Sequence, residues 1–232
     1  MENGTPKTIK SIARHEAAHF VTAWAVGCPA SFADITPAAR RPSKNPNNER
    51  VAYTSGFYPS SEVGLDDYSF NEILVSIAGP VADNWGQDGD RILENEKDKI
   101  DGALDSLVGN YEDDGDWYET LEELNKWRID IKDPTKLKDA LLWFIKALQE
   151  VLELCKTQWQ ELTEHLIKHG RINLNQGWWE SGNDFRFIAS WDGEDGLPPK
   201  AIRDCVKKYR LAVGALSNNV QTAPIRADIR TN

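Results

Sequence analysis

The chain has 232 residues, 40% of them hydrophobic, and nine tryptophans, so it can bury one sizeable core and is not intrinsically disordered. Its net charge of −10 argues against the overall basic surface by which proteins bind nucleic acid, and we expect no nucleic-acid partner. No apolar run reaches transmembrane length, and the first residues, MENGTPKTIK, lack the apolar stretch of a signal peptide. We therefore expect a cytoplasmic protein without a transmembrane segment, in which Cys28, Cys155 and Cys205 are reduced thiols.

The first predicted element is a helix over residues 6–26, which contains the stretch IARHEAAHFVTAWAVG. Its apolar residues recur at helical spacing, and Gly27 is typical of the position that follows a helix. The stretch SFADIT predicts a short strand, and VAYTSGFY, which is rich in β-branched and aromatic residues, predicts a second strand. Residues 37–50 between these strands are polar, and we expect a mobile loop there.

A second helix is predicted to begin at Ser69, because Ser69 and Glu72 form the capping-box pattern of a helix start. Gly79 and Pro80 interrupt this helix, and we expect a kink there because proline lacks a backbone donor. Two further helices are expected, one over residues 100–108 and one in NYEDDGDWYETLEELNKW. The acidic start of the latter suits the positive end of a helix dipole.

The longest predicted helix covers residues 134–169, with Asp133 as its N-cap and Gly170 at its end. Apolar residues recur along it at spacings of three and four. This pattern predicts one apolar seam, which lies in the core or joins two copies of the chain in a homo-oligomer. We expect residues 171–196 to be irregular and a last helix to cover residues 199–216.

These elements predict a mainly α fold with a small two- or three-stranded β element after the first helix. We expect a single domain over residues 1–216. The remaining residues, 217–232, are polar and are expected to form a flexible tail.

The motif HEAAH in the first helix predicts a zinc site. His15 and His19 lie four residues apart, so both imidazoles project from one helix face and can bind one zinc ion. Glu16 lies about 100° around the helix from His15, beside the metal, where it can accept a proton from a zinc-bound water. The alternative is a core helix whose two histidines are satisfied by polar neighbours.

Two histidines do not complete a catalytic zinc site, which uses three protein ligands and one open position. An aspartate or glutamate is expected to be the third ligand, and composition alone does not choose among them. The second histidine pair, His165 and His169 in HLIKH, has the same spacing but no glutamate after its first member. We interpret that pair as a helix-end cap before Gly170 rather than as metal ligands.

Five segments in order resemble the peptidase domain of the FtsH family of zinc metallopeptidases. They are HEAAHFVTAWAVG, ADITPAAR, VAYTSGF, SIAGPVADNW and EDDGDWYETL. The resemblance covers about residues 12–171, and the later TQWQELTEHLIKHGRI is similar to the family's helix before its C-terminal segment. It implies a helical zinc-peptidase domain in which His15 and His19 bind zinc and Glu16 is the catalytic base.

The resemblance also implies a third ligand, which best matches Asp116 in the Gly-Asp-Trp step at the start of a predicted helix. Asp113 and Asp114 are close enough to take that role, and a plain N-cap is the alternative for Asp116. The chain departs from the family pattern at Ala18, where a glycine is usual. It departs again at Asp83, where a glutamate is usual, and Asp83 is therefore left out of the expected site.

The sequence contains no Gly-x-x-x-x-Gly-Lys-Ser/Thr phosphate loop, unlike the ATPase module of FtsH proteases. We therefore expect an ATP-independent zinc metalloendopeptidase with one zinc ion per chain, acting on peptides or unfolded polypeptides. The strand in VAYTSGFY could pair with an extended substrate, and its alternative role is to pair with SFADIT. Two other functions stay open: a zinc-stabilised, non-proteolytic interaction or regulatory protein, and a zinc hydrolase of non-peptide amides.

Overall fold

The computed structural model describes the greater part of the predicted helices and strands. The described residues are 8–28, 30–36, 41–42, 49–50, 53–55, 65–84, 115–126, 129, 132–174, 183–193 and 197–221.

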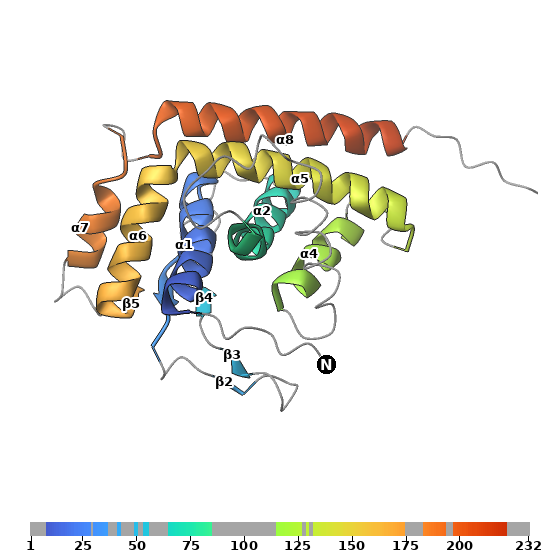
Figure 1. Cartoon of the computed structure of the whole chain (residues 1–232). Coiled ribbons are helices and arrows are strands. Elements are labelled where there is room, and N and C mark those ends of the chain that lie inside the picture. The colour runs from blue at the N-terminus through green and yellow to red at the C-terminus, as the bar shows by residue number, and fades with distance from the viewer. Residues whose placement is uncertain are drawn as a thin grey trace, which may run out of the picture.

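Helices make up most of the described chain (Figure 1). They are α1 (Ile9–Ala25), α2 (Leu65–Asn84), α4 (Gly115–Lys126), α5 (Pro134–Leu154), α6 (Lys156–His169), α7 (Asn183–Ala189) and α8 (Lys200–Gln221). The strands are β1 (Phe32–Asp34), β2 (Arg41–Pro42), β3 (Glu49–Arg50), β4 (Tyr53–Ser55) and β5 (Arg171–Asn173). The prediction of a mainly α fold with a small β element is confirmed. No helix in the described ranges is both long enough and apolar enough to cross a membrane.

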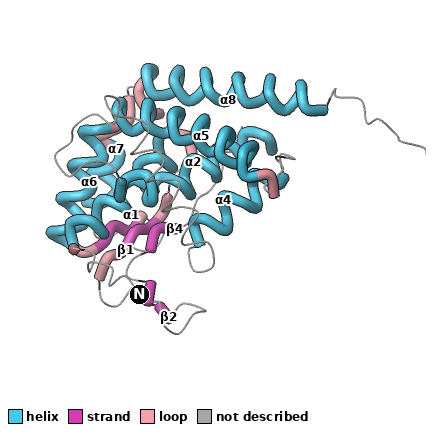
Figure 2. The backbone as a smooth tube through the Cα atoms, turned by 45° about the vertical axis from the view of Figure 1, so that its right-hand side comes forward, coloured by secondary structure: helices cyan, strands magenta, loops and turns pink. Residues whose placement is uncertain are grey.

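Three strands form an antiparallel sheet in the order β4-β1-β5, and β2 pairs with β3 in a separate two-stranded sheet. The register places Ala33 of β1 between Thr54 of β4 and Ile172 of β5. Ala33 and Ile172 have no exposed surface, so this face of the sheet lies on the core. Figure 2 shows β1 and β4 together against one side of the helices. The third strand of the sheet thus comes from the chain after α6 and not from the segment that directly follows α1.

Helix α1 runs through the middle of the helical body, with α2 on one side and α6 on the other (Figure 1). Thr8 caps its start by accepting a hydrogen bond from a backbone N–H of the first turn, and Gly27 follows its end with a φ of 81°. Residues 16–26 are all buried. Small residues such as Ala17 and Ala18, which have no exposed surface, allow the neighbouring helices to approach α1 closely.

The helix predicted over residues 134–169 is in fact two helices, because the chain turns at Cys155 between α5 and α6. Figure 1 shows α6 beside α1, whereas α5 crosses over the ends of α1 and α2. Apolar spacing continues through the turn from Val151 to Cys155 to Trp159, so the sequence contains no signal of the break. Trp159 Nε1 donates to the carbonyl oxygen of Arg14 at 2.9 Å, which ties α6 to α1 beyond the turn.

The apolar seam of α5 and α6 is buried within the chain's own core. Its fully buried members include Leu141, Leu148, Val151, Leu162 and Leu166. The core also contains all three cysteines, each buried, and no disulfide joins them. Burial of these side chains, at about 25 cal/mol per Å² of apolar surface, is the main stabilising term for helices of this kind.

The predicted start of the second helix is wrong. Helix α2 begins at Leu65, one turn before Ser69, and Ser69 is buried inside the helix instead of capping it. The helix also continues through Pro80. Tertiary packing overrides the local capping pattern here, since α2 packs against α1, α4, α5 and α8.

Other boundaries also differ from the predictions. The expected loop over residues 37–50 contains β2 and β3, and the expected irregular segment over residues 171–196 contains β5 and α7. Helix α8 continues to Gln221, past its predicted end. The helix predicted over residues 100–108 and the last part of the tail, residues 222–232, lie outside the described residues.

Gly170 lies in the turn that joins α6 to β5, and Gly27, which also has a positive φ, provides a comparison for measuring how much a side chain at position 170 would destabilise the fold. Gly170 has a φ of 77°, and a Cβ there would lie 2.6 Å from Thr36 Cγ2, whereas a Cβ at Gly27 would meet no atom within 4 Å. A side chain in the left-handed region costs about 1–2 kcal/mol. We expect Gly27→Ala to lower the free energy of unfolding by about 1 kcal/mol and Gly170→Ala by about 2–3 kcal/mol, as measured by urea unfolding.

The variant Thr36→Ser provides the control, because it removes the Cγ2 atom that the new methyl group would meet. In that background Gly170→Ala should cost about as much as Gly27→Ala. Equal losses for the two alanine variants in the wild-type background would show that the contact with Thr36 is of no consequence.

Candidate metal centre

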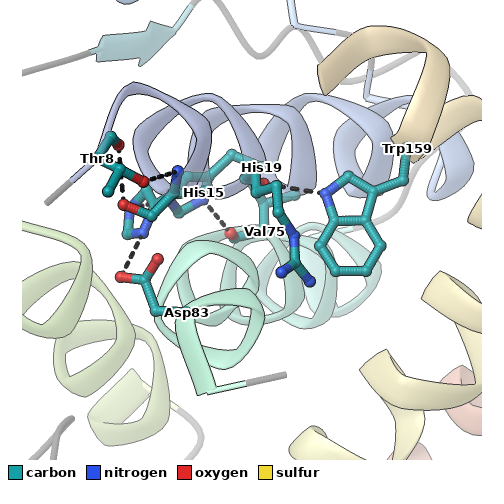
Figure 3. Close-up of polar contacts among 8 residues, drawn as sticks. Thr8, His15, His19, Val75, Asp83 and Trp159 are labelled. Carbon is teal, nitrogen blue, oxygen red and sulfur yellow. Dashed lines mark hydrogen bonds and ion pairs between the residues drawn. The ribbon is translucent and has the colours of Figure 1, made fainter. Parts of the chain in front are cut away.

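The two histidines of HEAAH lie one turn apart on α1 and turn their rings toward α2 (Figure 3). Their Nε2 atoms are 3.1 Å apart, their ring centroids are 4.8 Å apart, and the ring planes meet at 68°. His19 is buried, and His15 is partly exposed at the edge of the core. The structure thus brings together two predicted ligands, His15 and His19.

Each histidine is oriented through its other ring nitrogen. His15 Nδ1 lies 3.0 Å from Asp83 Oδ2, and His19 Nδ1 lies 2.7 Å from the carbonyl oxygen of Val75 (Figure 3). Carboxylate and carbonyl oxygens only accept hydrogen bonds, so the network assigns the ring proton to Nδ1 in both residues. Metal-binding histidines are held in the same way, by a second ring N–H that donates to a carboxylate or a backbone carbonyl.

With both ring protons on Nδ1, the two Nε2 atoms present lone pairs toward each other. Lone pairs 3.1 Å apart repel unless a proton or a metal ion lies between them. Two nitrogen ligands of a tetrahedral zinc ion, each about 2.05 Å from the metal, would lie about 3.3 Å apart. The separation of the two Nε2 atoms therefore fits two ligands of one zinc ion.

Gly79 makes the room for this pair. A Cβ at position 79 would lie 2.3 Å from the Nε2 atom of each histidine, a distance that no real contact allows. Val75, Gly79 and Asp83 follow one another at intervals of one turn, so they form a single stripe along α2. One stripe of α2 thus supplies a hydrogen-bond acceptor, a glycine that leaves room for the two imidazoles, and a second acceptor, opposite His19 and His15 on α1.

Glu16, the predicted base, is buried on a different side of α1. Its carboxylate accepts a hydrogen bond from the hydroxyl of Thr54 in β4, with 2.5 Å between Thr54 Oγ1 and Glu16 Oε2. A buried carboxylate without such a partner would be costly. Because Glu16 follows His15 directly, it lies beside the histidine pair and faces the sheet, while the pair faces α2.

The negative charge of Asp83 acts on the guanidinium of Arg14, and its carboxylate also contacts His15. The pKa of Arg14 lies below its ordinary value because burial penalises the charged guanidinium, and the nearby charge of Asp83 opposes this shift. The guanidinium carbon of Arg14 lies 5.0 Å from the centroid of the Trp159 ring. The outer side of the centre therefore carries both an anion and a cation.

The third predicted ligand belongs to α4. Asp116 lies in the first turn of α4, and its side chain lies outside the described atoms, as do Asp113 and Asp114 entirely. Helix α4 packs against α2. The pKa of Lys126, at the end of α4, is raised mainly by the hydrogen bond that Lys126 donates to Glu123, and to a smaller extent by the charge of Glu72 in the first half of α2. The end of α4 thus lies near the start of α2.

Position 116 lies at the opposite end of α4 from Lys126. Position 116 shares one helix face with positions 120 and 123, which follow it after one and two turns. Thr120 and Glu123 are both buried. The helix repeat therefore puts position 116 on the same face of α4 as these two buried residues.

Among the described side chains, no three His, Cys, Asp or Glu residues are grouped so that they could hold a metal ion. The described part of the candidate centre contains two candidate ligands, His15 and His19. All three candidates for the third ligand fall outside the described side chains, so their role stays a prediction.

The second histidine pair has the contacts of a structural pair. The ring of His165 stacks on Phe187 with 4.8 Å between centroids, and its Nε2 lies 3.6 Å from Asp184 Oδ1, both residues of α7. Burial lowers the pKa of His165, while the charge of Asp184 and a hydrogen bond to the backbone of Arg171 oppose that shift. These contacts connect the end of α6 to β5 and α7, and neither residue of the pair is followed by a glutamate.

Asp83, which the departure from the FtsH pattern leaves outside the expected site, has its carboxylate beside His15 Nδ1 in the structure. The signal was present in the sequence, since Asp83 follows Gly79 by one turn and so shares its helix face. Only the packing of α2 on α1 shows that this face meets the histidines.

Comparison with protein-family models and with curated proteins gives no match to this chain. The likeness to FtsH peptidases therefore remains a prediction from the ordered motifs.

A methyl group at position 79 should destroy the metal centre. In a helix interior alanine is favoured over glycine by about 1 kcal/mol, so helix propensity alone would make Gly79→Ala stabilising. The contacts of 2.3 Å with both Nε2 atoms act in the opposite direction. We expect the variant to bind well under half of the zinc that wild type binds, measured by atomic absorption after dialysis. The same change at Gly27, away from the centre, serves as the control, and full zinc binding by Gly79→Ala would contradict the described geometry.

Removal of the carboxylate that orients His15 should weaken zinc binding without abolishing it. Loss of such a partner of a metal ligand typically costs 10- to 100-fold in affinity. We expect Asp83→Ala to raise the zinc Kd by about that factor, measured by competition with a chromophoric chelator. Asp83→Asn keeps an acceptor oxygen and should lie between Asp83→Ala and wild type. An unchanged Kd in Asp83→Ala would show that Asp83 does not support the ligand.

Proposed function

We propose that this protein is a zinc-dependent metalloendopeptidase of the FtsH peptidase type, which hydrolyses peptide bonds in accessible or unfolded polypeptides. The observation that carries the proposal is the pair of Nε2 atoms 3.1 Å apart, each ring held through Nδ1, with a buried carboxylate as the next residue in the chain. A histidine pair with only a structural role does not require the combination of these three features.

His15 and His19 would hold the metal, and Asp116 is our candidate for the third ligand. When bound, zinc would polarise the scissile carbonyl and lower the pKa of a water molecule to near 7. Glu16 then has two tasks as a general base and general acid. Its carboxylate accepts a proton from the attacking water and later delivers that proton to the nitrogen of the departing amine.

We propose that the substrate backbone binds along strand β4. This strand pairs with β1 on one side, and among the described strands it has no partner on its other side. A strand with an open edge can pair with an extended peptide through main-chain hydrogen bonds. Because Thr54 of β4 contacts Glu16, a peptide on this edge would lie next to the base.

The decisive experiment compares wild type with Glu16→Gln, in zinc content and in cleavage of casein, an unstructured substrate. We expect about one zinc ion per chain in both proteins, because glutamate at position 16 is not a ligand. Cleavage should fall by a factor of about 100 or more in Glu16→Gln, since a positioned general base contributes about 10²–10⁴ to the rate.

The same measurements separate the other two functions. Zinc binding by wild type without cleavage of casein or of a peptide library would favour a non-proteolytic interaction protein. Absence of bound zinc would refute the metal centre itself. Cleavage of small amides but not of peptides would indicate a different zinc hydrolase.

The third ligand can be identified by substitution. We expect Asp116→Ala to lower the zinc content per chain, while Asp113→Ala and Asp114→Ala bind zinc as wild type does. Loss of zinc in one of the latter variants, with Asp116→Ala unaffected, would assign the ligand to that residue instead.

A further inference from the structure

The row of the sheet that faces the core contains one hydroxyl group among apolar side chains. Thr54 of β4, Ala33 of β1 and Ile172 of β5 are aligned by the strand register. Ala33 and Ile172 have no exposed surface. A valine at position 54 has the same shape as threonine, suits a strand equally well and adds no polar group to this row. The hydroxyl is explained by its contact with α1.

The hydroxyl of Thr54 can donate one hydrogen bond, and the structure directs it to Glu16. Thr54 Oγ1 lies 2.5 Å from Glu16 Oε2 and 3.4 Å from the carbonyl oxygen of Glu16, so the closer oxygen receives the proton. Within the described residues, the carboxylate of Glu16 accepts one hydrogen bond, and its donor is Thr54. Charge-assisted bonds of this kind are short and about twice as strong as neutral ones.

We propose that Thr54 is a positioning residue, which holds Glu16 by Oε2 and thereby reserves Oε1 for proton transfer. The inference rests on the proposed function of Glu16 as the base. One carboxylate oxygen accepts a hydrogen bond from Thr54, which restricts rotation of the carboxylate and leaves the other oxygen, Oε1, available to accept a proton. Without Thr54 the carboxylate could rotate, and misplacement of a catalytic group by about 1 Å can cost up to about 10²-fold in rate.

The position of Thr54 on β4 extends this role to the substrate. An extended peptide on the open edge of β4 would order the strand that carries the hydroxyl. The base is then best oriented when the substrate is in place. Thr54 thus connects the proposed substrate strand to Glu16 through a single side chain.

The test uses the full chain loaded with zinc and three variants. Thr54→Val removes the hydroxyl and keeps the shape, and Thr54→Ser keeps the hydroxyl and removes the methyl group. Thr22→Val is the matched control, because Thr22 is a fully buried threonine of α1 whose Oγ1 makes no hydrogen bond in the described structure. For each protein, kcat and KM are measured on a peptide, together with zinc content and urea unfolding.

We expect Thr54→Val to lower kcat about 10- to 100-fold, with KM within about twofold of wild type and with zinc content unchanged. Thr54→Ser should retain kcat within about threefold of wild type, and Thr22→Val should match wild type. Wild-type kcat in Thr54→Val would overturn the proposal. A loss of kcat in Thr54→Ser equal to that in Thr54→Val would overturn it as well, because packing and not the hydroxyl would then be responsible.

Crystal structures of the zinc-free proteins supply a readout that does not depend on activity. The Glu16 carboxylate should keep one orientation in wild type and in Thr54→Ser, and should take another orientation or several in Thr54→Val. An identical Glu16 side chain in Thr54→Val would refute the positioning role. If wild type cleaves no substrate while Glu16 moves as expected, the proposed function fails and the positioning of Glu16 by Thr54 stands.

Discussion

The close contact of α1 and α2 at Gly79 is the constraint on which the candidate centre depends. The imidazoles of His15 and His19 occupy the space that a side chain at position 79 would fill, and small residues surround this point on both helices. Only at this separation can one helix hold both rings of the other through Val75 and Asp83. The geometry of the centre is therefore a property of the interface between two helices and of neither helix alone.

The second feature of the centre is that its polar groups have partners inside a largely apolar core. His19 and Glu16 are both buried, and each finds a hydrogen bond on a different neighbouring element. Unpaired polar groups at such depth would cost on the order of 1–3 kcal/mol each. The histidines pair with α2 and the glutamate pairs with β4, so the imidazoles and the carboxylate are held on different sides of α1. The proposed function assigns a different chemical role to each side.

The elements that could be predicted are those whose signal is local. The helix around HEAAH, the strands in SFADIT and VAYTSGFY, and the helix after Gly-Asp-Trp all appear near their predicted positions. The predictions failed where long-range packing decides the structure. The turn at Cys155 leaves the apolar spacing intact, and Ser69 has the pattern of a cap although packing extends α2 by a turn before it. The strand β5 is three residues long, and it exists because β1 is beside it.

The sequence by itself determined which residues carry the proposed chemistry. A spacing of four places His15 and His19 on one helix face whatever surrounds them, because the helix repeat is a local property of the backbone. Tertiary structure alone decided how these residues are held. Asp83 meets His15, and Thr54 meets Glu16, across separations of 68 and 38 residues in the chain. Contacts at such distances arise from the packing of whole helices and strands, which no local pattern in the sequence encodes.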